Sequence, residues 1–392
     1  MDAELTAVRA LPRDHDRATL VGRAWLPGDV GGPGVVAVRG GEAFDLTRLA
    51  PTMADLINAP DPVALARDDR AASLGPVTAL LEASHADRTS ERVAHLLAPT
   101  DLSALKAAGV TFVKSMLERV VEEATRGDPN AAASARARIE GLVGGDLGSI
   151  VPGSEAAAKL KAHLIEAGAW SQYLEVGIGV DAEIFTKAQP MSAVGTGAEI
   201  GIHPRSAWNN PEPEVVLVVA SDGRIVGATL GNDVNLRDFE GRSALLLGKA
   251  KDNNAACAMG PFIRLVDEGF TIDAIRGLVV TLKVEGTDGY VLEGSSSMRE
   301  ISRDIEDLVG QLIGGTHQYP DGAALFCGTM FAPVEDRDVP GHGFTHKLGD
   351  IVTIAAPELG CLVNRVNHSD KAPPWTFGAS QLLRNLAARG VL

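Results

Sequence analysis

The strongest hydrophobic pattern of the chain lies around residues 212–233, where two apolar runs flank a turn. Residues 215–220 are rich in branched side chains, which are typical of β-strands, and residues 225–230 form a second such run. The Asp222-Gly223 pair between them indicates a tight hairpin turn. If the loop has two residues, Ser221 pairs with Arg224 and the numbers of paired residues add to 445. Asp233 then lies opposite Glu212.

This hairpin brings acidic side chains together at one end. Glu212 and Glu214 share a face because side chains alternate along a strand, and Asp233 joins them from the paired strand. Carboxylates this close raise one another's pKa, and a hard divalent cation with oxygen ligands relieves the repulsion. Mg²⁺ or Mn²⁺ suits this ligand set better than zinc. A solvated acidic strand edge is the alternative that the pattern leaves open.

Other segments predict a mixture of strands and short helices. Short strands are expected within residues 18–49, with a turn at Gly40-Gly41, and again at 175–181, 182–188 and 323–329. Helical spacing begins at Ser103, a further helix is expected over 131–142, and Ser154 is a candidate cap for a helix over 155–167. Residues 1–99 resemble a small mixed accessory domain, and residues 100–392 the catalytic domain. The predicted class is α+β, mainly β, with a twisted antiparallel β-roll.

Composition narrows the possible partners. A net charge of −15 and a pI near 5.1 over 392 residues argue against nucleic acid or an anionic membrane. The three cysteines are widely spaced, which favours reduced, buried thiols in a cytoplasmic protein. No apolar leader or run of 18 apolar residues is present, and the Gly-rich segments lack both the G-x-G-x-x-G and the Walker spacing.

Several motifs together resemble the fumarylacetoacetate hydrolase family. They are the E-x-E of Glu212 and Glu214, the segment NDVNLRD at 232–238, the Ala-Lys pair at 250–251, and the closing pattern of Gly328-Thr329, Leu348-Gly349-Asp350 and Leu359-Gly360. The resemblance covers about residues 100–392. The phrases WNNPEPEVVL, GNDVNLRDFEGRSALLL, KAKDNNAACAMGPF and HQYPDG are similar to the subgroup of 2-keto-3-deoxy-D-xylonate (pentonate) dehydratases.

The resemblance implies a catalytic β-roll, a bound Mg²⁺ and a homodimer or homotetramer. By motif it makes Glu212, Glu214 and Asp233 the metal ligands. Lys251 is expected beside the metal, in contact with a substrate oxygen, and the alternative is a surface lysine. The candidate substrate-binding residues are Thr329, Lys187 and Arg237, although Lys187 could instead be solvated and Arg237, like Arg119, could form a structural ion pair.

One departure from the family pattern bears on the reaction type. The hydrolases of the family carry a His and a Glu three residues apart after an aromatic residue, whereas this chain has Ser115 and Glu118 after Phe112. Serine alone is no base near pH 7, so water activation for C–C hydrolysis is in doubt and elimination is favoured. Glu118 is the candidate acid/base, with Ser115 beside it. The alternative for Glu118 is a solvated residue on the helix surface.

Three hypotheses follow. The first is an Mg²⁺-dependent dehydratase that converts 2-keto-3-deoxy-D-xylonate, a small sugar acid, to 2-oxoglutarate semialdehyde in oxidative pentose catabolism. The second is a hydrolase that cleaves the C–C bond of an acylpyruvate or 2,4-diketo acid. The third is a protein that binds a metal–keto acid complex without turnover, and the combination of Glu212, Glu214, Asp233, Lys251 and Thr329 disfavours it.

Overall fold

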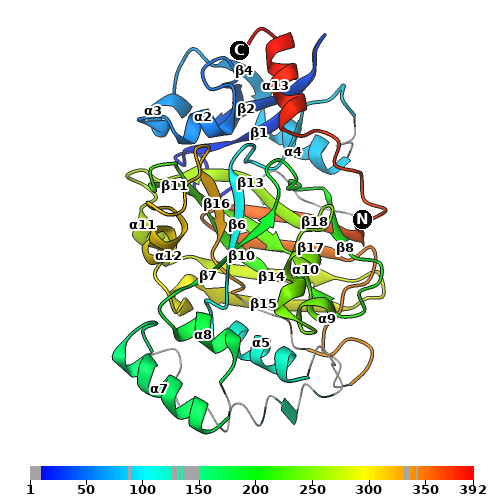
Figure 1. Ribbon diagram of the computed structural model, residues 1–392. Helices are drawn as coiled ribbons and strands as arrows, with labels where there is room; N and C mark the ends of the chain where they lie inside the picture. The colour runs from blue at the N-terminus through cyan, green and yellow to red at the C-terminus, as the bar shows by residue number, and fades with distance from the viewer. Residues whose placement is uncertain are drawn as a thin grey trace.

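The protein is described from a computed structural model. The structure describes residues 10–86, 90–125, 150–168, 170–330 and 343–392, together with positions 131, 134, 135, 137, 333 and 335–340 between them. The described part is mainly β, which confirms the predicted class, and it consists of two large open sheets with helices at both ends (Figure 1).

The larger sheet has eleven strands in the order β4-β3-β2-β1-β13-β11-β10-β16-β6-β7, and β5 pairs with β1. Its strands are β1 (Leu20–Leu26), β2 (Gly32–Arg39), β3 (Glu42–Asp45), β4 (Ala72–Pro76), β5 (His95–Leu96), β6 (Ala104–Gly109), β7 (Glu183–Ala188), β10 (Pro213–Val219), β11 (Ile225–Asp233), β13 (Cys257–Leu265) and β16 (Ala323–Phe326). Strand β1 pairs with β13, so the first hundred residues share this sheet with the strands that carry the acidic hairpin. The domain boundary at residues 99 and 100 stays a prediction.

The second sheet has five strands in the order β15-β14-β17-β18-β8. They are β8 (Glu199–Ile202), β14 (Val279–Glu285), β15 (Val291–Ser297), β17 (Ile351–Ala356) and β18 (Gly360–His368). Pairing is antiparallel except between β16 and β6 and between β18 and β8. A short ladder of β9 (Asn209–Asn210) and β12 (Asn235–Leu236) extends the acidic hairpin.

The main core fills the space between the two sheets. Leu217 of β10 and Leu230 of β11 lie in the same buried cluster as Leu282 of β14 and Ile354 of β17. Alternation explains this arrangement, because every second side chain of each strand faces the opposite sheet. The other face of β10 and β11 is therefore available for the acidic residues.

Helices lie at the two ends of the molecule in Figure 1. One end holds α2 (Met53–Ile57), α3 (Pro62–Ala66), α4 (Val77–Ala86) and α13 (Ala379–Ala388), and the other holds α5 (Val113–Thr125), α7 (Glu155–Glu166) and α8 (Gln172–Ile178). The remaining helices are α9 (Arg237–Glu240), α10 (Leu247–Lys251), α11 (Ile272–Arg276) and α12 (Ile305–Leu312), with 3₁₀ turns η3 (Ala244–Leu246) and η4 (Met298–Glu300). Among the described residues, no helix has the length and apolar character needed to cross a membrane.

Several local predictions are confirmed and two are wrong. Ser154 caps α7 by accepting a hydrogen bond from the Ala157 amide. The helix expected from Ser103 begins only at Val113, because residues 104–109 form β6 beside β16. The strand expected at 175–181 is largely the helix α8, which Ser171 caps. The helix expected at 131–142 lies for the most part outside the described residues.

Candidate metal centre

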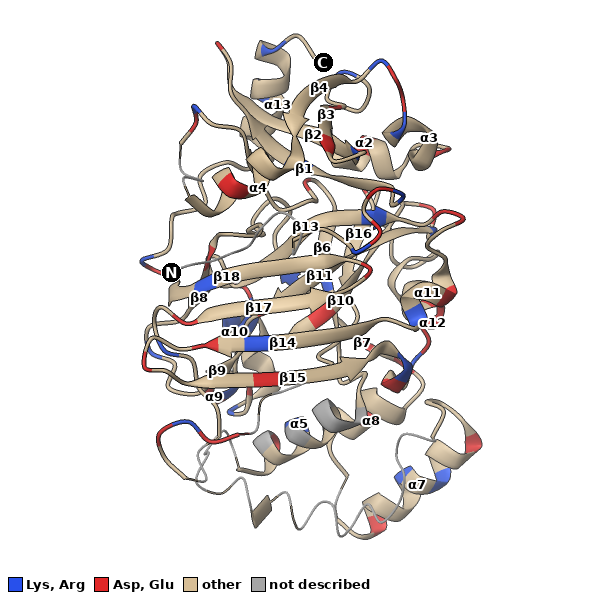
Figure 2. Cartoon of the chain, turned by 180° about the vertical axis from the view of Figure 1, so that it is seen from behind, with Lys and Arg blue, Asp and Glu red and all other residues tan. Residues whose placement is uncertain are grey.

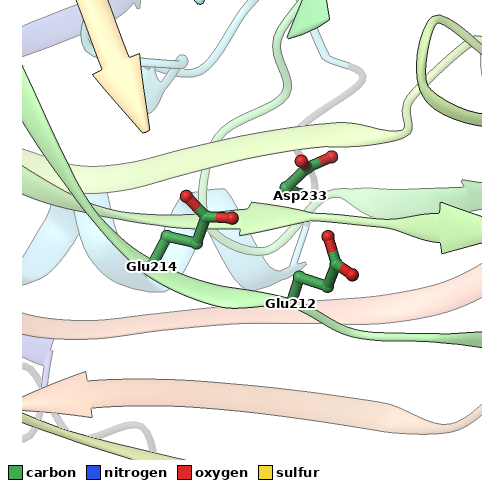
Figure 3. A group of neighbouring side chains, drawn as sticks. All are labelled: Glu212, Glu214 and Asp233. Carbon is green, nitrogen blue, oxygen red and sulfur yellow. The ribbon is translucent and has the colours of Figure 1, made fainter. Parts of the chain in front are cut away.

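Strands β10 and β11 bring three buried carboxylates to one face of the larger sheet. Glu212, Glu214 and Asp233 each offer an oxygen atom, and these atoms all lie within 4.8 Å of one another (Figure 3). Each of the three residues is 1% exposed. Within the described residues this is the one group of acidic, His or Cys side chains with metal-like spacing.

The register of the hairpin is the predicted one, but its turn is different. Pro213 pairs with Asn232 and Val218 with Gly227, so these residue numbers add to 445. The loop has three residues instead of two, since the Ala220 amide donates to the Arg224 carbonyl. A bulge between Val218 and Val219 restores the register by adding one residue on β11. Asp233 therefore reaches Glu212, and its amide donates to the Glu212 carbonyl at 3.0 Å.

Two lysines hold the Asp233 carboxylate. Lys251, at the end of α10, donates from Nζ to Glu212 Oε2 at 2.6 Å and to Asp233 Oδ2 at 2.9 Å. Lys187 of β7 lies 2.7 Å from Asp233 Oδ1 and donates to the Lys251 carbonyl at 2.8 Å. Lys187 thus fixes both a carboxylate of the triad, which is the group of Glu212, Glu214 and Asp233, and the backbone of Lys251.

A third cation comes from helix α5. The Arg119 guanidinium is paired with Glu212 and lies 3.2 Å from Glu240 Oε2 at the end of α9. The sequence suggests only a structural ion pair for Arg119, yet this arginine contacts a carboxylate of the triad. Helix α5 therefore lies directly over the acidic face.

The three carboxylates differ in their tendency to ionise. Burial opposes ionisation of Glu212, but Lys251 and Arg119 outweigh it and lower its pKa to about 2. Burial raises the pKa of Glu214 well above its usual range, and the charges of Asp233 and Glu212 raise it further. The donors of Glu214 are neutral: the Gly328 amide at 2.7 Å and the Thr329 hydroxyl at 3.5 Å.

This donor set fits a hard divalent cation. Glu214 has oxygen atoms beside two like charges, and a cation among the three carboxylates would let it ionise. Carboxylate oxygens are the ligands that Mg²⁺ and Mn²⁺ prefer in proteins. Glu212, Glu214 and Asp233 could therefore hold such an ion, with Lys251 next to it.

Strand β16 and the loop after it supply the next part of the site. Gly328 has a φ of +105°, a conformation that side-chain-bearing residues rarely adopt, and a Cβ there would collide with Thr111. This turn points the Gly328 amide at Glu214 and places Thr329 beside it. The predicted substrate residue Thr329 is thus brought to the triad, together with Lys187 and Lys251.

The structure connects the other predicted residues less directly to the triad. Arg237 of α9 is buried, and its guanidinium lies 5.2 Å from the centre of the Trp208 ring. Ser115 and Glu118 belong to α5, but their side chains lie outside the described residues. Their assigned roles stay predictions.

Glu183 is a site residue that the sequence analysis misses. Burial raises its pKa to about 7, the charge of Glu240 acts in the same direction, and Arg119 and Lys251 oppose both effects. Gly109, its partner across β6, leaves room for the carboxylate. A signal was present in the sequence: Glu183 lies four residues before Lys187 on one strand, and alternation puts both side chains on the same face.

Comparison with known proteins places this fold and site in a family. Residues 157–367 match the family model described as "Fumarylacetoacetate (FAA) hydrolase C-terminal". The chain belongs to the fumarylacetoacetate hydrolase family. All three carboxylates and Lys251 lie within the matched residues, as do Glu183 and Thr329.

Two curated relatives of this chain are named as sugar-acid dehydratases. The 2-dehydro-3-deoxy-D-arabinonate dehydratase of Saccharolobus solfataricus is 35% identical over 199 residues, which are 51% of this chain and 63% of the relative. A Haloferax volcanii protein named "Probable 2-keto-3-deoxyxylonate dehydratase" is 29% identical over 194 residues, 50% of this chain and 63% of the relative. The chain thus matches somewhat less than two thirds of the length of these relatives.

A solved structure of a related enzyme has the same fold. A 2-keto-3-deoxy-D-arabinonate dehydratase complexed with magnesium and 2,5-dioxopentanoate superposes with a TM-score of 0.59 at 24% identity. The match covers 89% of this chain and 99% of the solved one. It confirms the predicted family fold over nearly the whole chain.

Proposed function

We propose that this protein is an Mg²⁺-dependent hydro-lyase that converts 2-keto-3-deoxy-D-xylonate into 2-oxoglutarate semialdehyde and water in oxidative pentose catabolism. The observation that carries the proposal is the buried triad of Glu212, Glu214 and Asp233, with Lys251 bonded to two of its carboxylates. The names of the two curated relatives support the substrate class, and the compound bound in the solved relative, 2,5-dioxopentanoate, is the proposed product.

The reaction removes one water molecule from a five-carbon acid. A proton leaves C3, the C4 hydroxyl departs as water, and the resulting 2-keto acid carries a C3–C4 double bond. Transfer of a proton from C5 to C3 then gives the enol with a C4–C5 double bond. Loss of the enol hydroxyl proton and protonation of C4 convert this enol into the C5 aldehyde. The overall change is the loss of H₂O with no oxidant or reductant.

Three groups of this chain account for binding and for charge stabilisation. Glu212, Glu214 and Asp233 would hold Mg²⁺, or Mn²⁺ in its place, and the bound ion would supply Lewis-acid polarisation of the 2-keto oxygen. Burial alone would lower the pKa of Lys251, but Asp233 and Glu212 raise it above its usual value, so Nζ stays protonated. Its positive charge then stabilises the oxygen that becomes negative as the C3 proton leaves. Thr329 is suited to bind the substrate carboxylate.

Two carboxylates are candidates for moving protons. Glu183 has a pKa of about 7 and can both accept and release a proton near neutral pH. Glu118, the candidate from the family pattern, lies on α5, the helix whose Arg119 contacts Glu212. We assign the C3 proton to Glu118 and propose Glu183 as the group that serves C4 or C5.

The test is product analysis after incubation with 2-keto-3-deoxy-D-xylonate, its arabinonate isomer and an acylpyruvate. Loss of 18 mass units with an aldehyde signal in the NMR spectrum is expected for the sugar acids, and exhaustive chelation should stop it. Cleavage of the acylpyruvate without dehydration would instead support the hydrolase alternative. Turnover of none of these compounds despite metal binding would favour a binding protein.

Assembly and location complete the proposal. We propose a cytoplasmic homo-oligomer, a dimer or a tetramer. The three cysteines are free and buried, which fits a reducing compartment. The outer face of the β15-β14-β17-β18 sheet has no helix over it in the view of Figure 2, and Val279 and Val291 there are 46% and 55% exposed. Light scattering coupled to gel filtration would give the number of subunits.

A further inference from the structure

Two asparagines continue the face of the carboxylates beyond Glu212 and Asp233. Asn210 of β9 pairs with Asn235 of β12. This pair lies two residues beyond the pair of Glu212 and Asp233 on each strand. Alternation puts Asn210 on the face of Glu212, and Asn235 on that of Asp233. The intervening Val234 and the following Leu236 belong to the core on the opposite side, which confirms this orientation.

Both asparagines are fully buried. Asn210 Nδ2 donates to the Pro211 carbonyl at 2.9 Å. The other three polar atoms of the two side chains, Asn210 Oδ1 and both polar atoms of Asn235, have no hydrogen-bond partner among the described residues. Asn209, on the other face, behaves differently: its Oδ1 accepts from the His346 amide and its Nδ2 donates to Ser206. Buried amide groups are almost always satisfied, so the Asn210–Asn235 pair requires a ligand or ordered water.

The spacing of the pair suits one end of a keto acid. Residues two apart on a strand are separated by about 6.7 Å, so the pair lies at roughly this distance from the Glu212–Asp233 position. If the proposed function holds, the carboxylate and 2-keto oxygen of the substrate are bound at the triad. The remaining three carbons of the substrate, with the C5 hydroxyl, are long enough to span most of this distance.

We propose that Asn210 and Asn235 form a subsite for the C5 hydroxyl of the substrate. A hydroxyl both donates and accepts, and the pair presents unpartnered oxygen atoms and an unpartnered NH₂ group. The same NH₂ group can donate to the C5 aldehyde oxygen of the product. An alkyl end group would leave all these atoms unsatisfied, so the subsite selects hydroxylated chains.

Equilibrium binding of two unreactive acids tests this subsite without turnover. 5-Hydroxy-2-oxopentanoate carries the C5 hydroxyl but has no C4 leaving group, and 2-oxopentanoate lacks both. With Mg²⁺ present, calorimetry should show the hydroxylated acid binding about 10- to 100-fold more tightly to the wild type. Asn235→Leu should abolish the preference, and Asn210→Leu, which removes one unpartnered atom, should reduce it in part.

The matched control is Thr229→Val. Thr229 of β11 is also fully buried with an unpartnered hydroxyl, but it lies four residues before Asp233 and away from the asparagines. This variant should keep the full preference. Asn210→Leu provides the second test if Asn235→Leu does not fold, as judged by its melting curve.

Several outcomes would overturn the proposal. These are an absence of preference in the wild type, a preference retained in both asparagine variants, or equal weakening of both acids, which would mean that the pair only holds structural water. Dehydration of 2-keto-3-deoxy-D-xylonate is measured separately. A hydroxyl preference without dehydration would leave the subsite in place and remove the proposed reaction.

Discussion

Two buried charge clusters in this protein have opposite character. Around Asp350, Arg337 donates to both carboxylate oxygens at 2.6 and 2.9 Å and to Asp288 at 3.1 Å. His346 and the Lys347 amide complete the shell of Asp350. Around Glu214, by contrast, two further carboxylates lie close and the donors are neutral.

The difference appears in the pKa shifts. Burial opposes ionisation of Asp350, but His346 and Arg337 outweigh it and lower its pKa. Burial raises the pKa of Glu214, and no cation reverses the shift. A cluster whose charges are matched by the chain itself stabilises the fold. A buried carboxylate such as Glu214, which has like charges beside it and only neutral donors, is prepared for a ligand from outside. The predictions below test this contrast.

The largest effect is expected at the triad. Glu214→Gln and Asp233→Asn each remove an anionic ligand from a hard cation, so activity should fall below detection while the fold is kept. Calorimetric titration with Mg²⁺ should show that binding is lost in both variants. Full activity after exhaustive chelation would rule out the metal role.

The next effect concerns the proton carriers. Glu118→Gln should stop exchange of the C3 hydrogens with deuterated solvent and reduce turnover by about 10²–10⁴-fold, the usual contribution of a general base. Glu183→Gln should reduce turnover while C3 exchange continues, because we assign Glu183 to a later proton transfer. NMR of the substrate in deuterated solvent measures both.

Exchange at the wild-type rate in Glu118→Gln would exclude Glu118 as the base. If exchange is lost in Glu183→Gln instead, the two roles are reversed. Ser115→His, which restores the hydrolase-like pair, should reduce dehydration and leave Mg²⁺ binding unchanged.

Lys251→Met should lower kcat by about 10²–10³-fold, because it removes a positive charge opposite the oxygen that becomes negative. Mg²⁺ binding should change much less than kcat. Lys187→Met is the informative comparison, since Lys187 supports Asp233 and the Lys251 backbone and should affect metal affinity as well. A kcat within about threefold of wild type in Lys251→Met would leave Lys251 a structural role only.

The sequence predicts the carboxylate site well because its determinants are local. Branched strands, an Asp-Gly turn and period-two alternation are enough to bring Glu212, Glu214 and Asp233 together. The predicted turn was one residue too short, and a bulge between Val218 and Val219 compensates for the difference. The residues around the triad, Arg119 and Glu183, come from α5 and β7, so their approach depends on tertiary packing.

The two wrong predictions of secondary structure have the same cause, which is tertiary packing. Residues 104–109 form a strand because β16, more than two hundred residues later, pairs with them in parallel. The branched valines and isoleucine of 176–180 favour a strand by composition. Ser171 nevertheless caps a helix there, and Arg303 donates to the carbonyls of Val176 and Gly179. These partners cannot be located from the local pattern.

In the cluster around Asp350, we expect a substitution to lower the stability of the fold and to leave catalysis nearly unchanged. Arg337→Met leaves the Asp350 carboxylate buried without its bidentate partner, which typically costs about 3–5 kcal/mol of unfolding free energy. The activity of the folded fraction should stay within about twofold of wild type, because Arg337 and Asp350 are not among the residues assigned to the metal centre or to substrate binding. Chemical denaturation and initial rates measured on the same sample separate these quantities.

The smallest effect is the pH dependence of that cluster. Burial lowers the pKa of His346 in the folded state, although Asp350 opposes this effect. Below the ordinary histidine value of about 6.5, the unfolded chain therefore binds a proton that folded His346 does not, and stability falls as the pH is lowered. Asp350, with its lowered pKa, acts in the same direction at more acidic pH. Melting temperatures at pH 7 and pH 5 should thus differ less in His346→Gln than in the wild type. An equal difference in both proteins would show that His346 does not contribute to acid sensitivity, and that the carboxylates account for it.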